Sequence, residues 1–186
     1  FVFLTPDILL VFDRVESTDP SYEKRFLLHV PGSVELGTPR YILRNGSGVL
    51  LGRTLFPVAP TVNVVDGFRV DGTPHPPSTT GAESGGTRLE ISPPVASTRD
   101  YFLHIFRATE PSDLTWPDAV VTDIVSQIQV VVSMGSRNAT VVFRKADRLG
   151  GHFSSRDSAT GAGCDEYLGW LPGGEDGGPE SDADTG

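Results

Sequence analysis

Hydrophobic residues along most of the chain fall into short segments with strand-like patterns, separated by turns. Residues 8–15 (ILLVFDRV) are apolar at both odd and even positions, which predicts a strand buried on both faces. In residues 24–30 (KRFLLHV), Phe26, Leu28 and Val30 share one face, which predicts a strand with one side in a core. Residues 101–108 (YFLHIFRA) resume the strand pattern further along.

Turn-forming residues separate these segments. Residues 45–48 (NGSG) and the pair Asp66-Gly67 both predict hairpin turns, because Asn, Asp and Gly tolerate positive φ. Residues 71–86 are rich in Pro, Gly, Ser and Thr, which predicts an exposed loop. Residues 119–134 are rich in β-branched side chains and favour strand, with a short helical turn near residues 117–123 as the alternative.

This pattern predicts an all-β protein, with a mostly antiparallel β-sandwich over residues 1–154. Beyond residue 155 Ser, Gly, Asp and Glu dominate. We expect residues 155–186 to form a disordered acidic tail, because they offer little apolar area to offset the chain entropy lost on folding. The alternative is an ordered extension, begun by residues 167–171, that covers a sheet edge.

The charge of the chain is unevenly distributed. Of its 24 acidic residues, seven lie between residue 165 and the end, where there is no Lys or Arg. The rest of the chain carries 17 acids and 15 bases, so it offers no basic field to nucleic acid. No apolar run approaches the roughly 18 residues that a membrane span needs. Because Phe1 begins inside a strand-like pattern, we expect the N-terminus to be a cut within a longer protein.

Candidate chemistry is sparse. The four histidines, none of them spaced from another as in a local metal motif, are His29, His75, His104 and His152. The chain has no G-x-S-x-G motif and no phosphate loop, and Cys164 has no basic neighbour to lower its pKa. The sequence therefore predicts no catalytic residue, no metal site and no cofactor. Tyr41 and Trp116 remain as candidate carbohydrate contacts, because exposed aromatic rings can stack on sugars.

The order of several segments carries further information. FVFLTPDILLVFDRV, a strand ending in DRV, is followed by YEKRFLLHV, a strand reaching LLH. TLFP, RLEISPP and DYFLHIFRA come next, and VVFRK, which ends at Lys145, could match a closing strand. In this order the segments resemble the heparinase II/III-like polysaccharide lyases, over about residues 1 to 151.

The resemblance implies that the chain is the C-terminal β-sandwich portion of a larger lyase, which also has an N-terminal helical toroid domain. Such enzymes cleave uronic-acid polysaccharides by β-elimination: a base removes the C5 proton of a uronate whose carboxylate is neutralised, and the glycosidic oxygen leaves. The family's catalytic and metal-binding motifs do not occur in this chain. No catalytic role passes to any residue here, His29 of the LLH segment included, and the chain alone is expected to be inactive.

Two hypotheses of different classes follow. In the first, the chain supports a secreted lyase, extracellular or periplasmic, whose partner is a uronic-acid polysaccharide. In the second, it is a freestanding, non-catalytic carbohydrate-binding or adhesive β-sandwich. A reading frame upstream of Phe1 that encodes a helical toroid would favour the first, and a start codon directly before Phe1 would favour the second.

Overall fold

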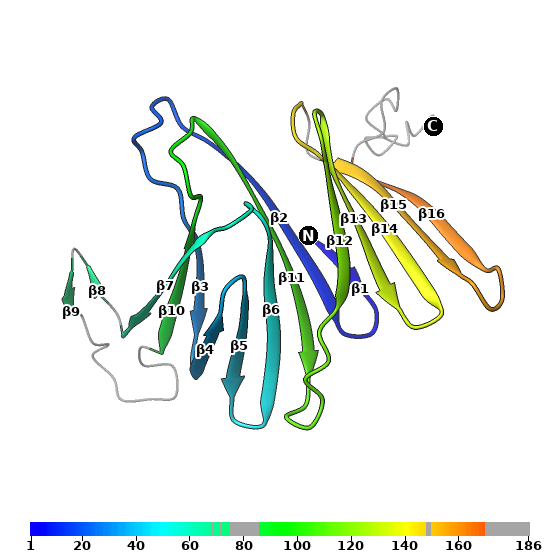
Figure 1. Ribbon diagram of the computed structural model, residues 1–186, viewed down its shortest axis with the longest axis horizontal. Helices are drawn as coiled ribbons and strands as arrows, with labels where there is room; N and C mark the ends of the chain where they lie inside the picture. Colours follow the sequence, from blue (N-terminus) through cyan, green and yellow to red (C-terminus); the bar gives the residue numbers. More distant parts are fainter. Residues whose placement is uncertain (68, 71, 75–85, 148–149, 170–186) are drawn as a thin grey trace, which may run out of the picture. The chain divides into compact units, whose positions relative to one another are not determined.

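The computed structural model describes residues 1–67, 69–70, 72–74, 86–147 and 150–169, and these contain strands but no helix. The predicted all-β fold is therefore confirmed. No helix in the described ranges could cross a membrane. The chain divides into two compact units, Phe1–Asp118 and Ala119–Gly186, whose strands are labelled in Figure 1.

The first unit contains two antiparallel sheets. The larger has the strand order β1-β2-β11-β6-β5-β4 and the smaller the order β3-β10-β7. Two short strands, β8 (Arg69–Val70) and β9 (Thr73–Pro74), pair with each other. The other strands are β1 (Val2–Leu4), β2 (Ile8–Glu16), β3 (Phe26–Val30), β4 (Ser33–Gly37), β5 (Arg40–Asn45), β6 (Gly48–Phe56), β7 (Thr61–Asp66), β10 (Thr87–Ser92) and β11 (Arg99–Thr109).

The two sheets of the first unit share a hydrophobic core. Leu89 and Ile91 of the smaller sheet are fully buried in one cluster with Tyr41, Leu43 and Phe106 of the larger sheet. Apolar side chains of alternate residues thus meet between two layers, as in a β-sandwich. The sandwich prediction is confirmed for this unit.

In the larger sheet β2 is the second strand from one edge and β11 is the third. The two strands pair along their length, from Glu16 opposite Arg99 to Ile8 opposite Arg107. Leu10 is fully buried on one face of β2. Its neighbours Leu9 and Val11 pack against the core cluster on the other face. The prediction that this segment is a strand covered on both faces is confirmed.

The second unit is one antiparallel sheet with the strand order β12-β13-β14-β15-β16. Alternate residues of its central strands are fully buried, among them Val130 and Val141. A helical turn near residues 117–123 does not form, because that segment lies in β12. The strands are β12 (Asp118–Ile124), β13 (Gln127–Met134), β14 (Arg137–Arg144), β15 (Gly150–Asp157) and β16 (Gly163–Gly169).

The described fold extends beyond the domain boundary expected at residue 154. β15 continues to Asp157, and β16 pairs with it from Gly163 opposite Arg156 to Gly169 opposite Gly150. Backbone hydrogen bonds order this polar segment, and such bonds need no apolar alternation. The boundary at 154 is therefore too early. The part of the predicted disordered tail at residues 170–186 lies outside the described residues.

The two predicted hairpin turns have different outcomes. Asn45 and Gly48 pair at the end of a β5–β6 hairpin, and Gly46 between them has a φ of 58°. Asp66-Gly67 also turns, with Gly67 at a φ of 71°, but it does not join paired strands. β7 pairs with β10 and β8 with β9, so the second hairpin prediction is wrong. Most of the loop predicted at residues 71–86 lies outside the described residues.

Candidate functional site

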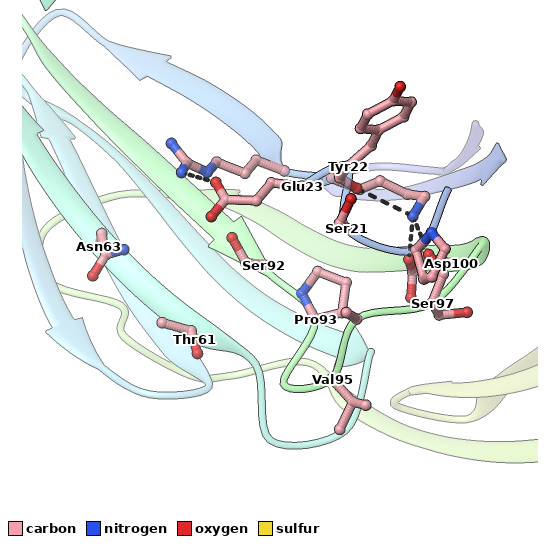
Figure 2. Close-up of a pocket in the computed structure, with 14 residues that line it drawn as sticks. Ser21, Tyr22, Glu23, Thr61, Asn63, Ser92, Pro93, Val95, Ser97 and Asp100 are labelled. Carbon is pink, nitrogen blue, oxygen red and sulfur yellow. Dashed lines mark hydrogen bonds and ion pairs between the residues drawn. The ribbon is translucent and has the colours of Figure 1, made fainter. Parts of the chain in front are cut away.

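A polar depression of about 320 Å³ opens in the first unit, where several segments meet. Its volume falls near the lower end of the range of roughly 300–1,000 Å³ that is typical of small-molecule sites. It is lined by residues 20–25, which precede β3, by β7, by the end of β10 with the loop that follows, and by Asp100 of β11 (Figure 2). Residues far apart in the sequence therefore contribute to one surface.

Three uncharged polar side chains form one side of this depression. Thr61 and Asn63 are two residues apart on β7, so they point to the same face of the smaller sheet. Ser92 of β10 is the direct pairing partner of Thr61. Among the described residues the side chains of all three have no hydrogen-bond partner within the protein, so their donors and acceptors are available to a ligand or to water.

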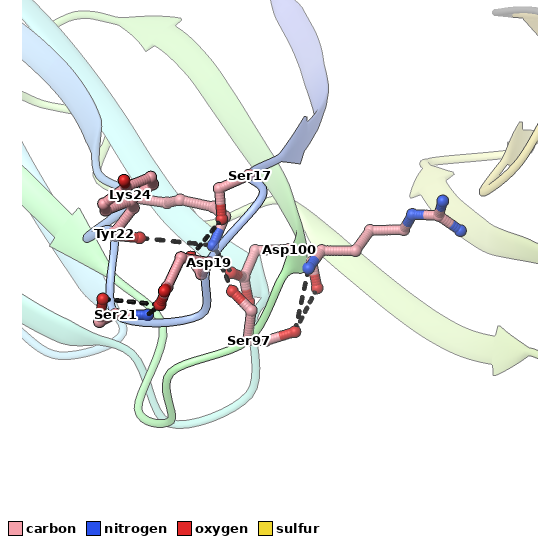
Figure 3. A network of polar contacts seen from close by, with 8 residues as sticks. Ser17, Asp19, Ser21, Tyr22, Lys24, Ser97 and Asp100 are labelled. Carbon is pink, nitrogen blue, oxygen red and sulfur yellow. Dashed lines mark hydrogen bonds and ion pairs between the residues drawn. The ribbon is translucent and has the colours of Figure 1, made fainter.

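Another part of the depression is fixed by a nearly buried ammonium group. The side chain of Lys24 is only 5% exposed, and its Nζ lies 3.1 Å from Oδ2 of Asp100. Nζ also donates to the carbonyl oxygens of Ser97 and Tyr22 (Figure 3). Three acceptors match the three donors of a lysine ammonium, so the charge of Lys24 is satisfied inside the protein.

The charge of Arg25 is also paired. Its Nη1 donates to Oε2 of Glu90 over 3.1 Å, and its Nη2 to the carboxylate of Glu23. Glu90, whose side chain is 8% exposed, also accepts from Arg88 over 2.9 Å. Two guanidinium groups therefore hold one nearly buried carboxylate beside the depression.

A tight turn leads into the lining segment. The carboxylate of Asp19 accepts from the hydroxyl of Ser21 over 2.7 Å and from its backbone N–H over 2.8 Å. These bonds, led by the hydroxyl, lower the pKa of Asp19 because they stabilise its charged form. The hydroxyl of Ser17 donates to the carbonyl of Asp19 (Figure 3). This turn positions the residues that enter the depression.

Of the two aromatic residues predicted to contact carbohydrate, Tyr41 is placed in the core. It is 1% exposed, and its ring lies 6.2 Å from that of Phe106. Its place on the same strand face as Leu43 directs it between the two sheets. Tyr41 therefore offers no ring face to a sugar, and its expected exposure is corrected.

Trp116, the other predicted contact, is half-buried, and the guanidinium of Arg40 lies 5.2 Å from its ring centre. The loop before it is held by Arg107, which donates to Asp113 over 2.7 Å and to the carbonyl of Thr115 over 2.8 Å. One face of the indole is thus occupied by a cation–π contact. Neither Tyr41 nor Trp116 lines the polar depression.

The described histidines lie apart from one another. His104 is fully buried, and burial lowers its pKa to about 3. His29 is exposed on β3, and Nε2 of His152 on β15 contacts the carboxylate of Asp165 on β16. His75 lies outside the described residues. No group of three or more His, Cys, Asp or Glu in the described part of the chain could hold a metal ion.

Cys164 lies on β16, where its thiol donates to the carboxylate of Glu166 over 3.1 Å. That carboxylate raises the pKa of Cys164, since the negative charge disfavours the thiolate. The thiol is therefore less reactive than an isolated cysteine. This supports the prediction that gave Cys164 no nucleophilic role.

Two apolar cavities of about 330 Å³ each lie elsewhere in the first unit. They share Leu28 of β3, Leu50 of β6 and Ala108 of β11. Their walls are mostly aliphatic and aromatic, so they offer few hydrogen-bonding groups for a polar ligand. Compared with these two cavities, the polar depression offers more hydrogen-bonding groups to a soluble polar ligand.

The depression was not visible in the sequence. Alternation within TVNVV does place Thr61 and Asn63 on one face, but nothing local indicates which segments lie beside them. No family model matches the chain, and no curated protein is significantly similar to it. The fold and this site therefore define a class only: an all-β protein with a polar depression, whose charged groups are paired, on a two-sheet sandwich.

Proposed function

We propose that this chain is the C-terminal β-sandwich portion of a heparinase II/III-like polysaccharide lyase, and that it holds polysaccharide rather than cleaving it. The observation that carries the carbohydrate-binding role is the depression with Thr61, Asn63 and Ser92 unpaired on one side. Hydroxyl and amide groups both donate and accept hydrogen bonds, as sugar hydroxyls do. An open polar surface of this kind suits a polyhydroxylated chain.

The place of the resembling segments supports the family proposal. Residues 8–15 lie in β2 and residues 100–108 in β11, and these two strands are neighbours in the larger sheet. Residues 26–29 of the LLH segment lie in β3, whose Phe26 packs against β11 through His104. These three segments thus lie together in the first unit, as parts of a single ancestral domain would, whereas VVFRK lies at β14 of the second unit.

The ionisable groups of the depression support a holding role. β-Elimination needs a base free to take a proton and a group that neutralises the uronate carboxylate. Lys24 and Asp100 are committed to each other, and Arg25 is committed to Glu23 and Glu90. In this proposal a toroid domain supplies the chemistry, and the sandwich supplies part of the surface along which the polysaccharide lies.

The second candidate is a freestanding carbohydrate-binding or adhesive β-sandwich. The same depression favours it, since binding through Thr61, Asn63 and Ser92 requires no attached enzyme. The coding sequence upstream of Phe1 separates the candidates. A helical toroid with Tyr and His motifs in that region supports the lyase, and a start codon directly before Phe1 supports the freestanding module.

Two measurements on the purified chain test the proposal. The first is electrophoresis in gels that contain alginate, heparan sulfate, hyaluronate or a neutral glucan. Retardation by at least one polymer is expected, and Asn63→Ala should reduce it. Asn138→Ala is the comparison variant, because Asn138 is exposed and lines a separate polar pocket of about 440 Å³ in the second unit. Unchanged migration in every gel would contradict carbohydrate binding.

The second measurement is the ultraviolet absorbance of unsaturated uronate products during incubation with the same acidic polymers. We expect no increase, because the carboxylates and the basic side chains of the depression are engaged in ion pairs. If the absorbance rises steadily, and Asn63→Ala or a substitution of Lys24 abolishes that rise, catalysis belongs to this chain and the holding role is overturned.

A further inference from the structure

We infer that the depression binds an uncharged part of a glycan, through its hydroxyl groups, and does not bind the carboxylates of uronic acids. The inference rests on the proposed carbohydrate-binding function and names the ligand class of the same site. It follows from a contrast within the lining. Its charged side chains are engaged in ion pairs, whereas the uncharged side chains of Thr61, Asn63 and Ser92 have no hydrogen-bond partner among the described residues.

The formal charges of the lining cancel. The lining contains two bases, Lys24 and Arg25, and two acids, Glu23 and Asp100. A site for a polyanion is expected to present an excess of positive charge, because unpaired cations attract the anion and gain from its approach. This depression has no such excess.

The ammonium group of Lys24 is poorly placed to bind the carboxylate of a ligand. Its ammonium is nearly buried, and its donors are directed at Asp100, Ser97 and Tyr22. A ligand carboxylate would have to displace one of these acceptors and lie beside the carboxylate of Asp100. Two carboxylates at one ammonium repel each other, and separating a nearly buried ion pair is costly.

Arg25 is restricted in a similar way. One of its nitrogens is engaged by Glu90, which is itself nearly buried and also bound by Arg88. Its other nitrogen is engaged by the exposed carboxylate of Glu23. A uronate that approached Arg25 would meet the negative charges of Glu23 and Glu90 first. The electrostatics of this side of the depression therefore disfavour an anion.

The uncharged side has the opposite character. Thr61 and Asn63 are exposed, Ser92 is half-buried, and no described residue uses their side-chain hydrogen-bonding groups. Figure 2 shows these three residues on neighbouring strands, apart from Asp100. Two hydroxyls and an amide can each donate and accept, so they match vicinal sugar hydroxyls without any change of charge.

Apolar lining adds to this preference. Val95 is 73% exposed, and it lies with Pro93 in the loop after β10. The C–H face of a hexose ring can cover such side chains and remove them from water. In Figure 2 the ring of Tyr22 extends away from Thr61 and Asn63, so Tyr22 is not assigned a stacking role.

Calorimetric titration of the full chain with length-matched oligosaccharides tests the inference. Neutral probes are cello-oligosaccharides and manno-oligosaccharides, and acidic probes are oligomers of alginate and hyaluronate. We expect a neutral probe to bind, with an affinity that changes less than twofold between low and high salt. Asn63→Ala should weaken that binding by about three- to tenfold, the loss of one net hydrogen bond. Asn138→Ala should leave it unchanged.

Each other outcome has a defined meaning. Binding of only the acidic probes, with an affinity that falls steeply as salt screens the charges, would overturn the inference and leave carbohydrate binding intact. A neutral probe could also bind the wild type and Asn63→Ala but not Asn138→Ala. That result would place the site in the second unit and overturn the inference. If no probe binds, the inference and the proposed carbohydrate-binding role fail together. Circular dichroism of each variant verifies that loss of binding is not loss of fold.

Discussion

The ring of Phe26 on β3 stacks on the imidazole of His104 on β11, with ring centroids 3.9 Å apart and ring planes 29° apart. Because β3 and β11 belong to different sheets, this contact joins the two layers of the sandwich. Nδ1 of His104 lies 3.4 Å from the Tyr41 hydroxyl and 3.2 Å from that of Thr54. Nε2 is buried with no hydrogen-bond partner among the described residues. A neutral imidazole suits these surroundings, and a charged one does not.

His104 should make the protein less stable in mild acid. Burial lowers its pKa from the ordinary 6.5 to about 3 in the folded state. As the pH falls below about 6.5, the unfolded chain takes up a proton that the folded chain excludes until about pH 3. The free energy of unfolding therefore decreases with falling pH, by a total on the order of 4 kcal/mol over this window.

Denaturant unfolding of the wild type and of His104→Phe at several pH values checks this prediction. Both proteins lose stability in acid because their carboxylates titrate, so the difference between them isolates the histidine. The wild type should lose on the order of 3 kcal/mol more than His104→Phe between about pH 7 and pH 4. If the free energy of unfolding of the two proteins falls in parallel with pH, then His104 can be protonated in the folded state, which contradicts the prediction.

The ion pair between Lys24 and Asp100 should be important for stability. Lys24→Met keeps most of the side chain and removes the charge, leaving a 13% exposed Asp100 carboxylate without its partner. Breaking a buried pair on one side typically costs about 3–5 kcal/mol, and the partial exposure of Asp100 places the expectation nearer 2–3. Thermal or urea unfolding measures the loss.

Glu16→Gln provides the matched control for that experiment. Glu16 pairs with Arg99 over 3.1 Å, but both side chains are about half exposed or more. Pairs of this kind contribute about 0–1 kcal/mol. Equal effects of Lys24→Met and Glu16→Gln would mean that the Lys24 pair is solvated in solution.

Gly52 should not tolerate a side chain. A Cβ at Gly52 would lie 2.1 Å from Cε2 of the buried Tyr41 ring, which has little room to move. Gly52→Ala should therefore lower the free energy of unfolding by about 1–3 kcal/mol, the usual cost of overpacking. Gly37→Ala is the control, because a Cβ there meets only one backbone oxygen at 3.8 Å. Similar stabilities of the two variants would argue against the buried position of Tyr41.

How far the sequence predicts this fold can be judged from particular segments. The two-faced apolar pattern of β2 correctly predicts a strand covered on both faces, because such burial leaves a direct mark on composition. Tyr41 could also have been placed correctly, since it alternates with charged Arg40 and shares a face with Leu43. β16 (GCDEYLG) leaves no such mark, because pairing with β15 orders it without an apolar face.

The candidate site was harder to predict for a different reason. Lys24 and Asp100 are 76 positions apart in the sequence, and Thr61 lies between them. Their proximity depends on which strands pair, and local propensity does not determine strand order. The charges could be counted in advance, but their mutual neutralisation could be found only from the assembled sheets.

Leu10 lies at a position where a charge should be severely destabilising. It is fully buried on β2 of the larger sheet, between β1 and β11, where it lies opposite Ile105 of β11. Leu10→Asp places an unpaired carboxylate there, which costs several kcal/mol or prevents folding. Phe3→Asp is the control in the same β1–β2 hairpin, because Phe3 is 58% exposed. Soluble expression and circular dichroism report the outcome, and a Leu10→Asp protein that melts like the wild type would contradict this placement.

The last prediction concerns the C-terminal boundary of the fold. β16 pairs with β15 along seven residue positions, and β15 would become the new sheet edge without it. A chain that ends at Ala162 should therefore lose more than about 1 kcal/mol of stability and aggregate more readily, because a bare edge pairs with other chains. The acidic, Gly-rich composition of residues 172–186 predicts that a chain ending at Leu171 keeps the wild-type stability. Thermal unfolding and light scattering of both truncations, beside the full chain, test the two expectations together. Equal melting temperatures for the chain ending at Ala162 and the full chain would show that β16 adds nothing to the stability of the sheet. A loss of stability already present in the chain ending at Leu171 would show that the fold extends beyond that residue.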